Sequence, residues 1–159
     1  MRPRFSHDGK WIFYSGSLAG RSEVYRVPLG GGPPVQVTHN GNSGLSAQDS
    51  TDGKTVYFPK AGALWQIPAG GGEERTVGIR VIGWYYQVMD DGIYFLAYRD
   101  RTQAEIRFFN FATRAERVVQ ALGQVRVSTG FAVSPDRKTF LYSLVEGPGS
   151  DLMIVENFR

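Results

Sequence analysis

The side chains best placed to do chemistry in this sequence are carboxylates at four similar positions. Asp8 and Asp52 stand in Asp-Gly-Lys triplets, Asp91 precedes Gly92, and Asp136 stands in an Asp-Arg-Lys triplet. Converging carboxylates could bind calcium, which needs several oxygen ligands at close spacing. A tight hairpin also requires Asp-Gly, because Gly adopts positive φ and Asp hydrogen-bonds its local backbone. We therefore expect these aspartates to shape turns, and we expect no metal site.

The two histidines are the next candidates for a base or a metal ligand. His7 lies in the first Asp-Gly turn and His39 opens a polar loop, and their spacing does not make them partners. The chain has no cysteine, which excludes disulfides, thiolate catalysis and cysteine-bound zinc. A transition-metal site would therefore have to recruit carboxylates. Both histidines are expected to be ordinary turn residues.

Nucleophile and phosphate motifs are incomplete. In the stretch 16–20, Ser17 stands one place too early for the G-x-S-x-G elbow of serine hydrolases. The triple glycines at 30–32 and 70–72 are not followed by a helix or by Lys-Ser/Thr, as a phosphate-binding loop requires. The sequence therefore predicts no catalytic residue and no cofactor, and the glycines are expected to form turns.

Aromatic residues beside arginines form the most suggestive binding pattern. Tyr, Trp and Arg are the residues that dominate protein-binding hot spots. The candidate partner-binding residues are Arg80, Trp84, Tyr85, Tyr86, Arg99 and Arg101. Large aromatics also fill cores, so we expect some of this set to be buried.

Composition indicates a globular all-β protein. The 159 residues are enough for one domain with a real core, and 42% of them are apolar. Twenty glycines and eight prolines without a collagen period indicate many turns. The best helix candidate, 113–122, contains a Val-Val pair that suits a strand equally well. A net charge of +3 does not by itself indicate nucleic acid, and no apolar run reaches membrane-spanning length.

The four aspartates also mark a repeat, since they lie 44, 39 and 45 residues apart. This period, with four short strands per unit, is typical of propeller blades. We predict an all-β fold: a single β-propeller segment over 1–159, with four-stranded antiparallel blades at about 1–40, 41–79, 80–121 and 122–159. Only three residues follow the last predicted strand, 151–156, so the last blade is expected to lack its outer strand.

The stretches 5–10, Phe-Ser-His-Asp-Gly-Lys, and 133–138, Val-Ser-Pro-Asp-Arg-Lys, resemble the F-S-P-D-G-K repeat of TolB-type (WD40-like, PD40) β-propellers. The resemblance covers essentially the whole chain, although the copies around Asp52 and Asp91 lack the Ser-Pro pair. It places four residues near the innermost strands of their blades, namely Phe5, Gln48, Val88 and Val133, and it places Val37, Arg75 and Val118 near the outer strands. Family propellers usually close six or more blades, so the resemblance implies further blades or a partner.

The resemblance implies a non-enzymatic protein-interaction or sensory scaffold, expected to be the C-terminal part of a larger bacterial protein. Its partner would be another protein, the remaining blades or a second copy, and nucleic acid is not expected. The alternative is the propeller domain of a prolyl-oligopeptidase-like or other hydrolase, with catalysis in a separate domain or in the funnel. The compartment, periplasmic or cytoplasmic, would depend on an upstream segment.

Overall fold

The computed structural model describes residues 3–18, 20–41, 46–100, 102–146 and 149–156. Over these residues the chain forms β-strands joined by turns and loops, and it contains no helix, so none that could span a membrane. The strands form four antiparallel sheets, and in each sheet the strand order follows the chain order. The predicted all-β class is confirmed. The chain divides into two compact units, Met1–Trp84 and Tyr85–Arg159.

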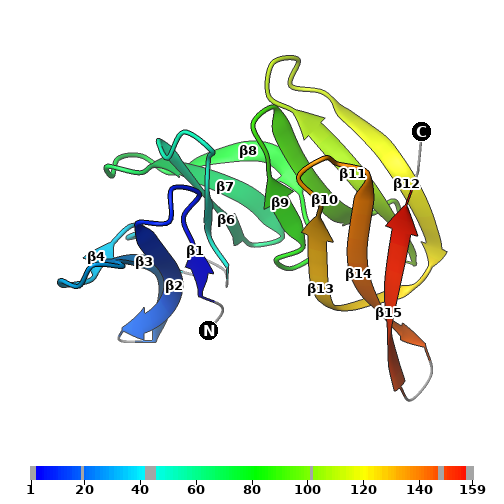
Figure 1. The fold of residues 1–159 in the computed structure, drawn as a ribbon, viewed down its shortest axis with the longest axis horizontal. Coiled ribbons are helices and arrows are strands. Elements are labelled where there is room, and N and C mark those ends of the chain that lie inside the picture. The colour runs from blue at the N-terminus through cyan, green and yellow to red at the C-terminus, as the bar shows by residue number, and fades with distance from the viewer. Residues whose placement is uncertain (1–2, 19, 42–45, 101, 147–148, 157–159) are drawn as a thin grey trace. The chain divides into compact units, whose positions relative to one another are not determined.

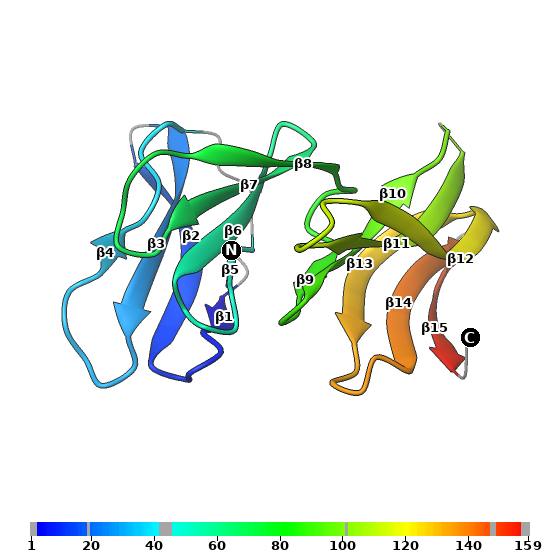
Figure 2. The same cartoon turned by 90° about the horizontal axis from the view of Figure 1, so that it is seen from above.

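The first unit contains two four-stranded sheets, which we call blade 1 and blade 2 (Figures 1 and 2). Blade 1 comprises β1 (Arg4–Phe5), β2 (Trp11–Leu18), β3 (Arg21–Pro28) and β4 (Val35–Gln36). Blade 2 comprises β5 (Gln48–Asp49), β6 (Thr55–Lys60), β7 (Ala63–Pro68) and β8 (Arg75–Arg80). Positive φ at Gly31, Gly32, Gly71 and Gly72 lets the triple-glycine segments turn the chain between the third and fourth strands.

The second unit contains blade 3, with four strands, and blade 4, with three. Blade 3 comprises β9 (Tyr86–Val88), β10 (Gly92–Tyr98), β11 (Gln103–Asn110) and β12 (Glu116–Gln124). Blade 4 comprises β13 (Arg126–Val133), β14 (Thr139–Glu146) and β15 (Gly149–Glu156). The three-stranded last blade was predicted, and the segment that suited either a helix or a strand forms β12.

Three hairpins between a first and a second strand share one hydrogen-bond pattern. In blade 1 the Ser6 hydroxyl donates to Asp8 Oδ1 at 2.7 Å and accepts from the Trp11 amide at 2.9 Å, while the Lys10 amide donates to the same Asp8 oxygen at 3.0 Å. The same bonds recur around Asp52 and Asp136. The aspartates thus hold turns, as predicted.

The third hairpin is built differently. The Met89 amide donates to the Gly92 carbonyl at 2.9 Å, so Asp90 and Asp91 form the loop and Gly92 already belongs to β10. A Cβ on Gly92 would lie 2.1 Å from the Phe109 carbonyl oxygen. This glycine is therefore required by close packing against β11 and not by the turn, and the expectation that Asp91 and Gly92 repeat the other hairpins was wrong.

Each sheet has two faces that can be compared between blades by counting from the hairpin. We call the face that carries Ile12 and Tyr14 of β2 the front face, and the face that carries Phe13 the rear face. The equivalent front residues are Val56 and Phe58 in blade 2, Ile93 and Phe95 in blade 3, and Phe140 and Tyr142 in blade 4. The equivalent rear residues are Tyr57, Tyr94 and Leu141.

The core of each unit is a rear face packed on the next front face. In the first unit, Phe13 and Val24 from the rear of blade 1 form one buried cluster with Val56, Phe58 and Ile67 of blade 2. In the second unit, the Tyr94 ring from the rear of blade 3 lies 5.3 Å from the ring of Phe140 on the front of blade 4. Both units therefore stack their blades with the same polarity.

Polar contacts between hairpins hold the blades of each unit together. The His7 amide and its Nδ1 atom lie 3.1 and 2.9 Å from Asp49 Oδ1, joining blade 1 to blade 2. In the second unit, Arg137 of blade 4 pairs with Asp90 and Asp91 of blade 3. Asp49 and Asp91 thus bind neighbouring blades.

Arg137 takes a left-handed conformation, with a φ of 62°, where Gly9 and Gly53 have 69° in the equivalent turns. We expect Arg137→Ala to be less stable than Arg137→Gly by about 1 kcal/mol, because both changes remove the ion pairs but only alanine keeps the backbone strain. Urea unfolding measures the difference. The matched control is Lys138, whose φ is not positive: there alanine should be at least as stable as glycine. Equal stability of the two Arg137 variants would contradict the strain.

Asp49 accepts hydrogen bonds from both the backbone and the ring of His7, and its side chain is only 6% exposed. We expect Asp49→Ala to lower the free energy of unfolding by about 1–3 kcal/mol, because it leaves two donors without their acceptor. His7→Ala keeps the backbone bond and should cost about 0.5–1.5 kcal/mol. Chemical unfolding followed by tryptophan fluorescence measures both losses in the free energy of unfolding. A larger loss for His7→Ala than for Asp49→Ala would contradict the prediction.

Candidate interaction surface

The residues that the sequence singled out for partner binding do not share one environment. In the first unit, Arg80 ends β8 and is exposed, and Trp84 is half-buried in a turn. In the second unit, Tyr85 is 7% exposed and Tyr86 is fully buried. Tyr86 belongs to β9 and therefore contributes to the core of its unit.

Arg99, one arginine of the predicted set, lies in the loop after β10. Arg99 is exposed, its guanidinium contacts the Gln103 side chain, and its amide donates to the Gln103 carbonyl at 2.8 Å. Asp100 shapes the same loop by accepting from the Thr102 amide and hydroxyl, each at 2.9 Å. Arg101 lies outside the residues that the structure describes.

The hairpin aspartates have lowered pKa values because they are hydrogen-bonded within their turns. Hydrogen bonds from Ser6 and from the Lys10 amide lower the pKa of Asp8 below its ordinary value of 3.8. The equivalent serine and lysine partners lower the pKa of Asp52 and of Asp136 in the same way. A general base at neutral pH needs the opposite shift, so these three carboxylates are suited to fixing backbone geometry. Within the described parts of the chain, no group of three or more acidic or histidine side chains is placed to hold a metal ion.

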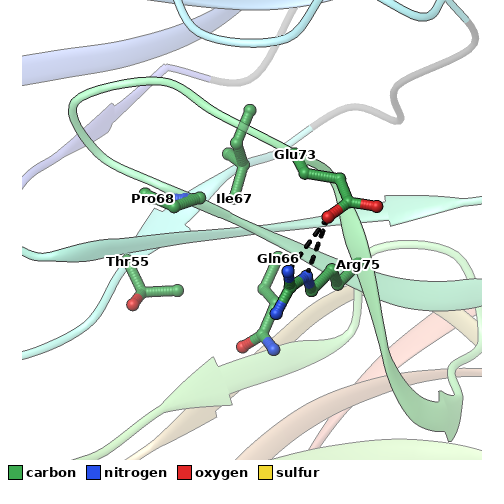
Figure 3. Close-up of a pocket in the computed structure, with 6 residues that line it drawn as sticks. All are labelled: Thr55, Gln66, Ile67, Pro68, Glu73 and Arg75. Atoms are coloured by element: carbon green, nitrogen blue, oxygen red, sulfur yellow. Dashed lines mark hydrogen bonds and ion pairs between the residues drawn. The ribbon is translucent and has the colours of Figure 1, made fainter.

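A pocket of about 300 Å³ opens on the rear side of blade 2 (Figure 3). Its lining residues are Thr55, Gln66, Ile67, Pro68, Glu73 and Arg75. Arg75 and Glu73 form an ion pair at 3.0 Å, and both side chains are more than 70% exposed. Because the only two charges of the lining neutralise each other in contact with water, the pocket lacks the desolvated charge typical of a catalytic centre.

The front face of blade 1 is the clearest interaction surface in the described part of the chain. Two rows of side chains cross β1, β2, β3 and β4 on this face: Phe5, Ile12 and Val27 in one row, and Tyr14, Tyr25 and Gln36 in the other. Phe5 is 65% exposed, and the other five side chains are half-buried. Neither row contains a charged residue.

Two tyrosines give this face a flat centre. The Tyr14 and Tyr25 rings stack with centroids 5.6 Å apart and an interplanar angle of 22°. Gly16 makes room for this arrangement, since a Cβ there would lie 3.0 Å from Cε2 of Tyr25. A preformed aromatic surface loses little side-chain entropy when it binds, which favours its use as a contact.

The sequence contains a second signal for this surface, which is separate from the Tyr, Trp and Arg composition used to choose the candidate residues. Residues 11–14, Trp-Ile-Phe-Tyr, are apolar without alternation, which is typical of a strand that is covered on both faces. Phe13 is covered by blade 2, whereas Ile12 and Tyr14 on the other face stay half-exposed. The apolar run therefore predicts two covered faces, but the structure covers only one, and the uncovered face is the front face of blade 1.

The four sheets, their hairpins and their repeated packing define the chain as a β-propeller segment. No protein-family model matches it, and no curated protein sequence matches it. Its structure is similar to TolB from Acinetobacter baumannii, with a TM-score of 0.77 and 17% identity over 97% of this chain and 40% of that one. It is also similar to a putative TolB from Agrobacterium tumefaciens, with a TM-score of 0.75 and 20% identity over 97% of this chain and 57% of that one.

The fold is therefore that of a TolB-like β-propeller segment, and the expectation from the F-S-P-D-G-K resemblance is confirmed. The chain spans between two fifths and three fifths of the length of these two TolB structures. Enzymes share the architecture: an oligogalacturonate lyase from Vibrio parahaemolyticus matches with a TM-score of 0.67 and 16% identity over 94% of this chain and 50% of that one. At these identities the likeness shows the fold alone.

The stacked tyrosines predict a specific effect of filling the space at Gly16. We expect Gly16→Val to destabilise the first unit by about 1–3 kcal/mol and to change the tyrosine signal in near-ultraviolet circular dichroism, because the new side chain displaces the Tyr25 ring. Ser17→Val is the matched control, since this exposed neighbour points to the opposite face of β2. An unchanged tyrosine signal in Gly16→Val would contradict the close contact.

Proposed function

We propose that this chain is a non-enzymatic scaffold segment that binds a protein through the front face of blade 1. The observation that carries the proposal is a pair of uncharged rows on this face, in which Phe5, Ile12, Tyr14, Tyr25 and Val27 remain partly open to water. Contiguous apolar surface with aromatic anchors is characteristic of protein-binding sites on otherwise polar molecules.

The chain itself supports this assignment. The equivalent front residues of blades 2 and 4 are buried: Val56, Phe58 and Phe140 each have no exposed surface, and Tyr142 is 5% exposed. Ile12 and Tyr14 have the same chemistry at the same place, but they keep exposed area. A blade face of this kind gains free energy when it is covered, at roughly 25 cal/mol per Å² of apolar surface.

The exposed arginines provide a secondary proposal. Arg80 in the first unit and Arg99 in the second unit could add charge-assisted contacts to a partner, since arginine combines a charged donor with a flat surface. Trp84 belongs to the same proposal as a half-buried side chain. Tyr85 and Tyr86 support binding only by positioning backbone, because they are buried.

A second candidate function is the propeller domain of a larger hydrolase. The observation in its favour is the likeness to enzyme structures, which include a prolyl endopeptidase structure matched with a TM-score of 0.60 and 15% identity over 98% of this chain and 26% of that one. In that case the reaction would be carried out elsewhere in the larger protein, and the segment would shape access to it.

The proposed function is tested by capturing partners with immobilised chain. We expect Phe5→Asp to reduce capture of proteins from a lysate of the source organism by at least about 30-fold, since truncating a hot-spot anchor costs 2 kcal/mol or more. The control is Val118→Asp, which places the same charge at an apolar residue of β12 in blade 3 that is 51% exposed and lies outside the face. Equal capture by Phe5→Asp and by the control variant would contradict the proposal.

The hydrolase alternative makes a different prediction. Turnover of proline-containing fluorogenic peptides by the purified chain, unchanged in Phe5→Asp, would favour an enzyme over a scaffold. We expect no turnover above the rate of buffer alone. Thermal unfolding of each variant confirms that it is folded before either comparison is made.

A further inference from the structure

We infer that the front face of blade 1 binds the rear face of blade 4 in a second copy of the chain, so that copies associate head to tail. The inference rests on the proposed function, because it names the partner of the same face. It goes further by identifying a second surface of the chain and by fixing the polarity of the contact.

The polarity comes from the contacts inside each unit. Phe13 on the rear of blade 1 packs with Val56 and Phe58 on the front of blade 2. Tyr94 on the rear of blade 3 packs with Phe140 on the front of blade 4. Both internal interfaces thus join a rear face to a front face. An open front face therefore fits an open rear face better than it fits another front face.

The rear face of blade 4 is the matching open surface. Ala132, Leu141 and Ile154 lie opposite one another on β13, β14 and β15 and form one row across this face. Leu141 is 36% exposed, Ile154 is 58% exposed, and Ala132 is also exposed. Leu141 occupies the position that Phe13 and Tyr94 occupy in the two internal interfaces.

The chemistry of the two faces is compatible. The front face of blade 1 offers large flat side chains, and the row on the rear face of blade 4 offers smaller aliphatic ones. The front rows of blade 1 and this row of blade 4 contain no charged residue. Beyond these rows, Glu23 on the front face is already hydrogen-bonded to the Thr38 hydroxyl and the Gly41 amide, and Arg21 and Arg126 lie at the ends of their strands. The contact between the rows therefore buries no unpaired charge. A front-to-front contact would instead oppose two protruding Phe5 rings.

The size of a blade face determines how strong the contact can be. Four strands about 4.8 Å apart and about 17 Å long project an area on the order of 300 Å². Two such faces together bury roughly 600 Å², which is below the range of permanent complexes. We therefore expect reversible association that increases with protein concentration.

The test uses the purified 159-residue chain and three single variants in sedimentation velocity. Phe5→Asp places a charge on the front face of blade 1, and Leu141→Asp places one on the rear face of blade 4. Val118→Asp, in β12 of blade 3, is the control outside both faces. We expect the average mass of the unmodified chain and of Val118→Asp to rise with concentration. Phe5→Asp and Leu141→Asp should each weaken self-association at least tenfold.

The decisive measurement is the equimolar mixture of Phe5→Asp and Leu141→Asp. Each variant keeps the face that the other lacks, so a head-to-tail contact predicts a one-to-one pair that does not grow further. A mixture that stays monomeric, or a Leu141→Asp protein that associates like the unmodified chain, overturns the inference. Ile154→Asp replaces Leu141→Asp if the latter loses its circular dichroism spectrum.

Failure of this inference can be separated from failure of the proposed function. A chain that is monomeric at every concentration overturns the head-to-tail contact. If Phe5→Asp still loses a captured protein in that case, the front face of blade 1 binds a different protein, and the proposed function stands. If Phe5→Asp loses neither association nor capture, both are wrong.

Discussion

The structure depends on one constraint: the second strand of each blade is apolar on both of its faces and therefore needs a neighbour on each side. In β2 the run Trp-Ile-Phe-Tyr has this character, and so do Val-Tyr-Phe in β6 and Phe-Leu-Tyr in β14. A sheet that is apolar on one face can leave its other face in water, whereas such a strand cannot do so without cost. Stacking of blades satisfies the constraint, and the hairpin contacts of His7 and Arg137 fix the register of each stack.

The features that sequence reasoning predicted are those that local chemistry determines. The Ser-Asp-Gly-Lys turns form their hydrogen bonds within five residues, so the pattern around Asp8 and Asp52 was visible in the sequence. The same holds for the triple-glycine turns. The third hairpin departed from prediction because Gly92 is selected by the Phe109 carbonyl, a neighbour that only the sheet brings close.

The binding residues were harder to predict because composition does not distinguish an exposed aromatic from a buried one. Tyr85 and Tyr86 have the chemistry of a hot spot and belong to the core of the second unit. Phe5, by contrast, precedes the hairpin serine, and its equivalent in blade 2 is Asp49, which accepts from His7. The same position therefore makes a polar contact with the neighbouring blade in blade 2, but it carries an exposed apolar ring in blade 1.

The way in which blade 1 keeps its front face in water bears on what that face can do. Tyr14 and Tyr25 cover each other by stacking, and Gly16 lets the Tyr25 ring lie close against β2, so part of their apolar area is already removed from water. Their hydroxyl groups can remain hydrated at the same time. The free chain thus pays less for the open face than a row of aliphatic residues would cost, and the gain on covering it is correspondingly smaller. A face with these properties is better suited to reversible contacts than to a permanent interface.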